Sequence, residues 1–301
     1  MCDLLNVNRA AVLKLFNKSE QSVKNDLKIL REWLKHQPHL PEIDDARLER
    51  LLVQRKFSIE RAKQTIDAHF TIRDQAPELF ENRDPTSDEL KKSFRMISWI
   101  PLKDQNDQYQ RPFIAKIFAE DPKDIDSTAH IKYNFIMQDI MLHHDYSNGS
   151  HLIFDLKDLK LVYMTIFSPA ILAKSLKVHM EAYGLRIAGL HIVFPPPFID
   201  AVLGVIRSLL KEKLLKRVHI HKDLESLHKI IPKKILPKDY GGEADELLKI
   251  RDDWEKHIET WRPWLIKESK VRVDESKRPK ESKTPNLLGS IHGTFKKLDI
   301  D

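Results

Sequence analysis

The chain has 301 residues, enough to bury a full hydrophobic core and to carry a smaller appended unit. Its composition is ordinary for a globular protein, and 51 basic against 45 acidic residues give a formal charge of +6, too even for a dedicated nucleic-acid binder unless the basic side chains cluster. The single cysteine, Cys2, excludes an internal disulfide and a cysteine-rich metal site. There is no transmembrane-length apolar run and no signal-peptide core, so we expect a cytoplasmic protein.

Helical spacing of apolar residues dominates the first part of the chain. It predicts helices over 19–38, over 44–56 and in a segment that begins at Ser58. A polar turn with Pro85 follows these segments. We therefore expect an all-helical N-terminal domain over residues 1–85.

The pattern changes near Ile97 to alternating strands and helices. Strand, helix and strand in succession are typical of a largely parallel sheet, which predicts an α/β fold for a second domain over residues 86–265. The expected strands are 111–119, 149–156, 185–194 and 218–221, and the expected helices are 128–142, 161–183, 198–210 and 245–264.

The stretch 183–217 is the most informative part of this domain. Its strand must end at Pro195, Pro196 and Pro197, which lack backbone donors. The helix over 198–210 is apolar around most of its circumference, yet it spans only about 20 Å, short of the roughly 30 Å of a bilayer core. A cationic cluster follows directly, made of Lys211, Lys213, Lys216 and Arg217.

Two interpretations of this helix remain open. It can be a lid over an oily cavity, with the cations placed to meet an anionic lipid surface. It can also be a plain core helix whose cations form a solvated face and favour the helix dipole. The stiff proline edge favours the lid.

The C-terminal region, 266–301, is treated as a tail. Residues 268–285 are rich in Lys, Ser, Glu and Pro, which predicts an extended or poorly ordered segment. Apolar residues return in 286–301, and we expect this end to dock back on the body.

Two groups of histidines do not predict a metal site. His143 and His144, followed by Asp145, point about 100° apart on a helix, whereas helical ligands recur at i and i+4. His219 and His221 on a strand offer only two donors. We therefore expect no metal and no cofactor. The sequence also lacks nucleotide-binding and hydrolase motifs, so we expect no catalytic residues and no enzyme activity.

Four blocks in a fixed order carry a family resemblance. They are LLVQRKFSIERA (51–62), SHLIFDLKDL (150–159), the long block 183–221 and LPKDYGG (236–242). Together they resemble the CRAL-TRIO lipid-binding family, in particular arthropod members similar to alpha-tocopherol transfer protein and cellular retinaldehyde-binding protein. The resemblance implies a three-helix N-terminal domain and an α/β lipid-binding domain with a mobile lid helix that exchanges ligand at membranes.

The resemblance also implies a phosphoinositide headgroup site. The basic residues that hold headgroups in tocopherol-transfer members correspond here to Arg55, Arg186, Lys213 and Arg217. Ala188 and Leu215 stand where that pattern often has further cations, and Lys211 and Lys216 are available to compensate.

A ligand cavity is expected between the predicted helices, the strands and the lid. Each candidate taken singly is more often an ordinary core residue, and we expect about half to touch ligand. The candidates are Ile136, Ile140, Phe154, Phe167, Ile171, Val178, Ile187, Leu190, Ile192, Phe194, Phe198, Val202, Val205, Ile206 and Leu209.

These features predict a monomeric carrier of one hydrophobic small molecule, such as a retinoid, carotenoid, tocopherol or similar lipid. Its partners would be that lipid and anionic phosphoinositide membranes, which trigger release, and no nucleic acid. The alternative is a phosphoinositide-binding membrane-trafficking adaptor. A hydrolase or isomerase acting on a bound lipid would need a nucleophile or acid–base pair that the sequence does not identify.

Overall fold

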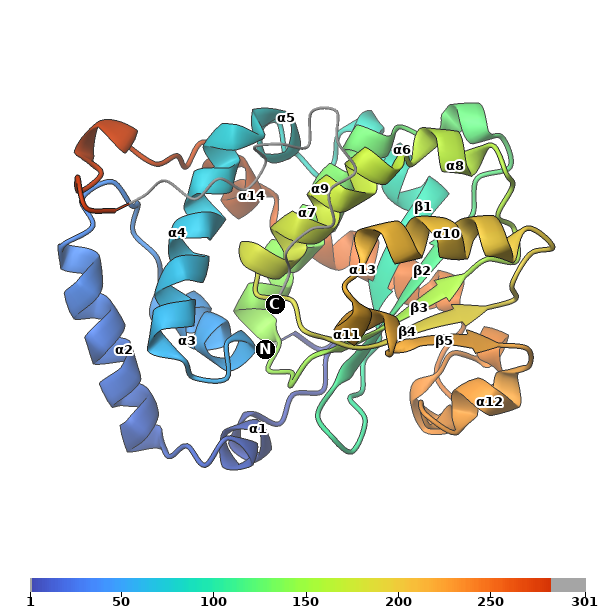
Figure 1. Cartoon of the computed structure of the whole chain (residues 1–301), viewed down its shortest axis with the longest axis horizontal. Coiled ribbons are helices and arrows are strands. Elements are labelled where there is room, and N and C mark those ends of the chain that lie inside the picture. Colours follow the sequence, from blue (N-terminus) through green and yellow to red (C-terminus); the bar gives the residue numbers. More distant parts are fainter. Residues whose placement is uncertain (1, 283–301) are drawn as a thin grey trace.

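The computed structural model describes residues 2–282, and its first part is helical (Figure 1). Side chains of Asn8, Ser19, Asp44 and Ser87 accept backbone hydrogen bonds at the starts of four of these helices. The three predicted helices are present, and three more elements accompany them. The helices are α1 (Arg9–Leu15), α2 (Glu20–Lys35), α3 (Asp45–Gln54), α4 (Ile59–Gln75), α5 (Pro77–Phe80) and α6 (Asp88–Met96).

A five-stranded sheet in the order β1-β2-β3-β4-β5 follows. β1 pairs antiparallel with β2 and the remaining pairs are parallel, which confirms the predicted α/β fold with a mostly parallel sheet. β1 is missing from the predicted strands because a five-residue run that ends in proline has too little periodicity. The strands are β1 (Ile97–Pro101), β2 (Arg111–Ile117), β3 (Ser150–Asp155), β4 (Ile187–Val193) and β5 (Val218–His221).

The strand order places the crossover helices together. Because strands β2 to β5 follow each other in chain order, right-handed crossovers put every connecting helix on the same face of the sheet. α9 accordingly contacts α10 (Figure 1). The connecting helices are α7 (Ser127–His144), α8 (Tyr163–Ile166), α9 (Pro169–Glu181), α10 (Ile199–Leu209) and α11 (Glu212–Leu215).

The C-terminal helices complete the fold. α12 contacts β4 and β5, and α13 contacts β1, where the indole N–H of Trp254 donates to the carbonyl of Pro101 at 3.0 Å. No helix within residues 2–282 is long and apolar enough to cross a bilayer. These helices are α12 (Leu224–His228), α13 (Leu247–Thr260) and α14 (Arg262–Glu268), and short 3-10 turns lie at Pro122–Asp124, Lys233–Ile235, Lys238–Tyr240 and Glu275–Lys277.

Helix α7 is shared by two hydrophobic cores. Ile136 and Ile140 belong to the main core, which surrounds the sheet, whereas Phe135 belongs to a second core formed largely by α2 to α4. The Phe135 ring stacks on Phe80 at 5.2 Å and on Tyr183 at 5.7 Å between centroids. The N-terminal helices are thereby packed against α7, and α4 also contacts α9.

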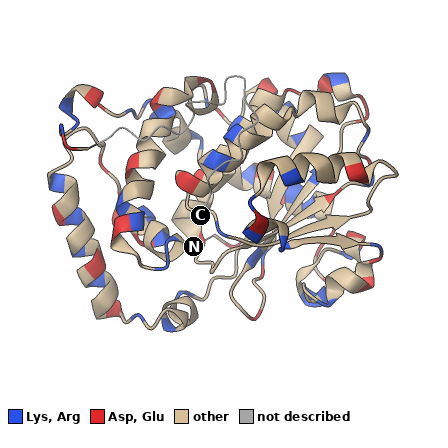
Figure 2. Cartoon of the chain, viewed as in Figure 1, with Lys and Arg blue, Asp and Glu red and all other residues tan. Residues whose placement is uncertain are grey.

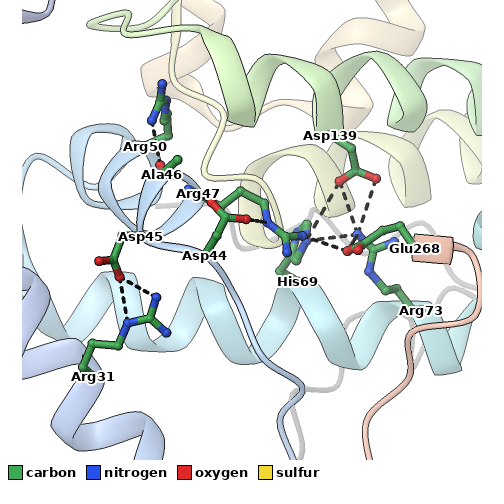
Figure 3. Close-up of polar contacts among 10 residues, drawn as sticks. All are labelled: Arg31, Asp44, Asp45, Ala46, Arg47, Arg50, His69, Arg73, Asp139 and Glu268. Carbon is green, nitrogen blue, oxygen red and sulfur yellow. Dashed lines mark hydrogen bonds and ion pairs between the residues drawn. The ribbon is translucent and has the colours of Figure 1, made fainter. Parts of the chain in front are cut away.

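A buried ionic network strengthens this junction (Figure 3). Asp139 of α7 is fully buried, and Arg73 Nη2 lies 3.2 Å from its nearest oxygen. Arg83 Nη1, which the figure does not draw, lies 2.6 Å from its other oxygen. Glu268 at the end of α14 lies 3.6 Å from Arg73 and 2.8 Å from Arg47. Burial alone would raise the pKa of Asp139, but the two arginines hold it well below its usual range.

The start of the tail differs from the prediction. Residues 269–282 are mostly irregular, but Val273 is buried and Arg278 Nη1 lies 2.7 Å from Asp67 of α4. Of the two expected alternatives, extended or poorly ordered, residues 269–282 fit the extended one, because Arg278 pairs with a carboxylate on the N-terminal helices. The predicted docking of 286–301 lies outside the described residues, and the domain limits at residues 85 and 265 stay predictions.

Candidate functional site

Helix α10, the predicted lid, is held loosely on the fold. None of its residues is buried, although most are apolar. Its inner side rests partly buried on the main core through Ile199, Val202, Leu203 and Ile206. Leu210 and Leu214, directly after the helix, are buried at 4% and 8% exposure. The helix is therefore anchored at its C-terminal end and only half-covered along its length.

The connection into α10 has the features of a hinge. Phe194 follows β4 with a φ of 52°, an uncommon conformation for a bulky residue, and it is 37% exposed. The three prolines after it have no N–H group to tie them into the sheet. Gly204 lies in the middle of the helix, and a Cβ atom there would meet no atom within 4 Å.

Helix α9, which contacts α10, is held in the same way. Of its residues only Val178 and His179 are buried, and its other apolar side chains are half-buried except Ala170, which is exposed. Leu176 and Met180 lean on the main core from the side of α9. Two adjoining helices with many apolar residues and so few buried ones leave much apolar surface only partly covered.

The structure separates the predicted cavity residues into three groups. The exposed one is Phe194. The half-buried group consists of Phe154, Phe167, Ile171, Phe198, Val202, Val205, Ile206 and Leu209. The buried group consists of Ile136, Ile140, Val178, Ile187, Leu190 and Ile192.

Not all of these residues lie near the lid. Val178 and Ile171 pack with the second core, against the N-terminal helices. Phe154, Val202 and Ile206 instead lean on the main core, which also contains Leu190 and Ile192. The structure thus brings these five strand and lid candidates to one core and places two α9 candidates in the other. Their contact with a ligand stays a prediction.

The four predicted headgroup residues do come together. Arg55 at the end of α3, Arg186 before β4, Lys213 in α11 and Arg217 before β5 all line one cleft of about 990 Å³. The described lining residues of this basic cleft include seven Lys and Arg but four Asp and Glu. Elsewhere the two kinds of charge are interspersed along the helices (Figure 2).

The cations of the basic cleft perturb one another. Burial, and then repulsion from Arg217 and Arg55, lowers the pKa of Arg186 to about 10. Repulsion from Arg186 is the largest cause of the lowered pKa of Lys56. Arg186 Nη2 donates to Asn148 Oδ1 at 2.9 Å, but its Nη1 is buried without a partner in the described part of the chain. Unpaired donors among like charges suit an anionic ligand.

Arg55 forms part of the cleft wall. Its Nε donates to Thr65 Oγ1 at 2.6 Å, and its Nη2 donates to the carbonyls of Met180 and Glu181 at 2.6 and 3.1 Å. Gly184, with a φ of +70°, lets the chain pass close to this side chain, since a Cβ there would lie 3.4 Å from Nε. Arg55 therefore braces α3 and α4 against the end of α9.

Three further cations of the cleft are missing from the predicted set, namely Lys56, Arg61 and Lys63. Lys56 and Phe57 both have left-handed backbones, with φ values of 54° and 58°. Lys56 directly follows Arg55, so the two adjacent basic residues in QRKF could have indicated that Lys56 also belongs to the cleft. Arg61 and Lys63 reach the cleft only because α4, which carries them, packs beside it.

The two departures from the resemblance have structural accounts. Leu215, in place of a lysine, packs partly buried against the main core. Ala188 lies at a shift in register between β3 and β4. Lys211 and Lys216 are not among the described residues that line the cleft, and Lys216 pairs on the surface with Glu212 at 3.1 Å.

Two family models match the chain. The first is "Pinta-like, UBA domain" over residues 19–90, and the second is "CRAL/TRIO domain" over residues 99–242. The chain belongs to the CRAL-TRIO family. This is a family of lipid-binding transfer proteins, so the predicted resemblance is confirmed.

Named relatives cover most of this CRAL-TRIO protein. "Alpha-tocopherol transfer protein-like" from Mus musculus is 31% identical and that from Homo sapiens 30% identical, each over 229 residues. These matches cover 74% of this chain and 66% of the relatives, so the chain spans just under two thirds of their length. Clavesin-2 from Homo sapiens is 27% identical over 236 residues, 75% of this chain and 71% of the relative.

Among solved structures, the crystal structure of Sfh5 is similar, with a TM-score of 0.48 and 16% identity. It covers 81% of this CRAL-TRIO protein and 92% of its own chain, but it is too distant to support a conclusion. The two family matches show which parts of the chain form the basic cleft. Arg55 and Arg61 lie in the first matched segment and Arg186 and Arg217 in the second, so the basic cleft is built from both.

Proposed function

We propose that this protein is a cytosolic carrier that binds one hydrophobic small molecule beneath α10 and transfers it between membranes. The observation that carries the proposal is α10 itself, an apolar helix without a buried residue that leads directly into the cations of the basic cleft. Moving its four half-buried inner side chains fully into water would cost about 3–6 kcal/mol. The lid therefore stays closed in water until lipid replaces its apolar contacts.

We infer a hydrophobic ligand because the side chains proposed to surround it are apolar. Phe154, Leu190 and Ile192 would form the floor, and Val202 and Ile206 the cover. A twenty-carbon ligand gains up to ~16 kcal/mol from burial, against ordering and association costs of ~4–15 kcal/mol. A retinoid, carotenoid, tocopherol or similar lipid has enough carbon atoms for its burial to offset these costs. We infer a carrier rather than an enzyme because the residues proposed for the floor and the cover are all apolar.

The basic cleft would act as the trigger for release. Lys213 and Arg217 lie in the same segment as Leu210 and Leu214, which anchor α10. A phosphoinositide headgroup drawn between these cations and Arg186 would pull on that anchor. Lid opening would then be coupled to arrival at an anionic membrane.

A transfer assay tests the proposal. A fluorescent retinoid or tocopherol is moved by the protein from phosphatidylcholine donor vesicles to acceptors with or without a phosphoinositide. The carrier should transfer faster to the phosphoinositide acceptors, Ile206→Asp should abolish ligand uptake, and Arg207→Ala on the exposed side of α10 should behave like the wild type. A purified protein that carries no lipid and takes up no apolar ligand would contradict the proposal.

A second candidate is favoured by the size of the basic cleft, which at about 990 Å³ is larger than the two other described cavities, of about 440 and 490 Å³. In this case the protein is a phosphoinositide-binding trafficking adaptor and the ligand is secondary. Flotation with phosphoinositide vesicles separates the two. An adaptor loses its function with Lys213→Ala and Arg217→Ala but keeps it with Ile206→Asp, whereas a carrier loses transfer with either kind of change.

A further inference from the structure

Three side chains from distant parts of the chain converge at the N-terminal end of the protein. Cys2 precedes α1, His144 is the last residue of α7, and His257 lies in the last turn of α13. Cys2 Sγ is 3.5 Å from His257 Nε2, and one ligand atom from each of the three residues lies within 4.8 Å of the other two. The fold alone brings them together.

One polar atom of this cluster lacks a hydrogen-bond partner among the described residues. The Cys2 side chain is buried, and His144 Nε2 is buried without a hydrogen-bond partner in the described chain. This nitrogen can therefore offer its lone pair to a ligand. Aromatic rings exclude water around them, since Trp261 lies 5.1 Å from the His144 ring and Trp254 lies 5.6 Å from the His257 ring.

We propose that Cys2, His144 and His257 bind a zinc ion that fastens the N-terminal segment to α7 and α13, with water in the fourth position. One thiolate and two imidazoles form a borderline-soft donor set that suits zinc better than magnesium or calcium. Zn–N bonds near 2.0–2.1 Å and a Zn–S bond near 2.3 Å put tetrahedral ligand atoms about 3.3–3.6 Å apart. The 3.5 Å between Sγ and Nε2 already fits this spacing.

The N-terminal segment is already positioned for such a link. The Asn6 N–H donates to the Lys103 carbonyl at 2.8 Å, and the Asn6 carbonyl accepts from Arg111 Nη2 at 2.9 Å. Leu5 is buried in the main core beside Cys2. Cys2 is thus held in place by its neighbours and is not a free chain end.

This proposal goes against the expectation of no metal, which considered His144 only with its sequence neighbours His143 and Asp145. The other two ligands lie more than a hundred residues away in either direction. The proposal is independent of the lipid-carrier function, because the cluster shares no residue with the lid or the described lining of the basic cleft.

Metal binding to the full chain tests the proposal directly. The protein, reduced and with its N-terminus unmodified, is dialysed against zinc and its metal content is measured. We expect one zinc per chain, a higher Tm with zinc, and a thiolate-to-metal charge-transfer band with cobalt in place of zinc. Cys2→Ser should abolish that band and His257→Asn should weaken zinc binding at least tenfold, whereas His36→Asn on the exposed end of α2 should change neither.

Two results would overturn the zinc site. One is a wild-type protein that binds no zinc after dialysis. The other is zinc binding, a cobalt spectrum and a Tm shift that persist unchanged in Cys2→Ser, a near-isosteric change whose folding is checked by circular dichroism.

Discussion

His151 and His191, on neighbouring parallel strands, are joined side chain to side chain, with His151 Nδ1 2.9 Å from His191 Nε2. His191 Nδ1 in turn lies 2.9 Å from His221 Nε2 on β5. The ends of this histidine row meet Gln110 Oε1 at 2.8 Å and Ser226 Oγ at 2.9 Å. Three imidazoles therefore cross the face of the sheet that α12 covers.

The histidine row should make the protein sensitive to acid. Burial is the main cause that lowers the pKa of His191 to about 2 and of His151 to about 4, well below the value of about 6.5 in the unfolded chain. Between pH 6.5 and 4 the unfolded state binds protons that the native state does not, so stability falls as the pH falls. Each such histidine contributes roughly 1 kcal/mol per pH unit.

Urea denaturation at pH 7, 6 and 5 measures this loss. His191→Gln should be less stable than the wild type at pH 7 but should lose less on acidification, because a titrating group is gone. His36→Gln, at an exposed histidine, should keep the wild-type dependence. A free energy of unfolding that stays constant from pH 7 to 5 would contradict this account.

Gly189 makes room for the His151–His191 contact. A Cβ atom at this position would lie 2.6 Å from His191 Nε2 and 2.7 Å from His151 Nδ1. We expect Gly189→Ala to force the rings apart and to destabilise the protein by about 1–3 kcal/mol. Gly204→Ala in α10 is the matched control, because its new methyl group meets open space and should stabilise the helix by about 0.5–1 kcal/mol. Thermal denaturation of both variants gives the comparison, and equal effects would refute it.

The buried carboxylate of Asp139 should be far more sensitive to removal than an exposed one. Asp139→Ala leaves Arg73 and Arg83 without their shared partner in the interior, at an expected loss of about 3–5 kcal/mol. Asp45→Ala breaks the exposed pair with Arg31 and should cost at most about 1 kcal/mol. Chemical denaturation measures both, and similar losses would argue against the burial of the network.

Membrane binding should depend on the cleft cations and not on basic residues in general. Lys213→Ala or Arg217→Ala should weaken binding to phosphoinositide vesicles about fivefold each, in line with roughly 1 kcal/mol per cation near an anionic surface. Lys216→Ala, which removes an exposed lysine paired with Glu212, should have little effect. Vesicle co-sedimentation at two salt concentrations gives the measurement. Equal weakening by all three changes would remove the case for a specific cleft.

Sequence patterns located most of the elements because periodicity and caps are local. Residues 218–221 were predicted as a strand and match β5, and the Ser168–Pro169 start of a helix follows from local chemistry alone. The histidine row could not be predicted, because the register shift between Ser150 and His151 decides which residues of β4 lie beside β3. Register is a tertiary property that no spacing in one strand reveals.

The residues of the basic cleft were also hard to predict, because the tertiary fold decides which of them meet. Arg55 and Arg186 were expected to meet only because of a family resemblance, since they are far apart in the chain. Arg61 and Lys63 were not predicted because a basic residue on a helix is usually a solvated charge, and only the packing of α4 turns them toward the cleft.

The ionic junction around Asp139 limits how this protein can be recombined. Its arginines come from the helical part and its aspartate from α7, so neither half is self-sufficient. In a chimaera, the first ninety or so residues would come from a relative. That segment must supply basic residues equivalent to Arg73 and Arg83, because Asp139 would otherwise be left buried without a partner. The two matched segments are therefore expected to be inherited together and to resist shuffling, although they are recognised as separate families.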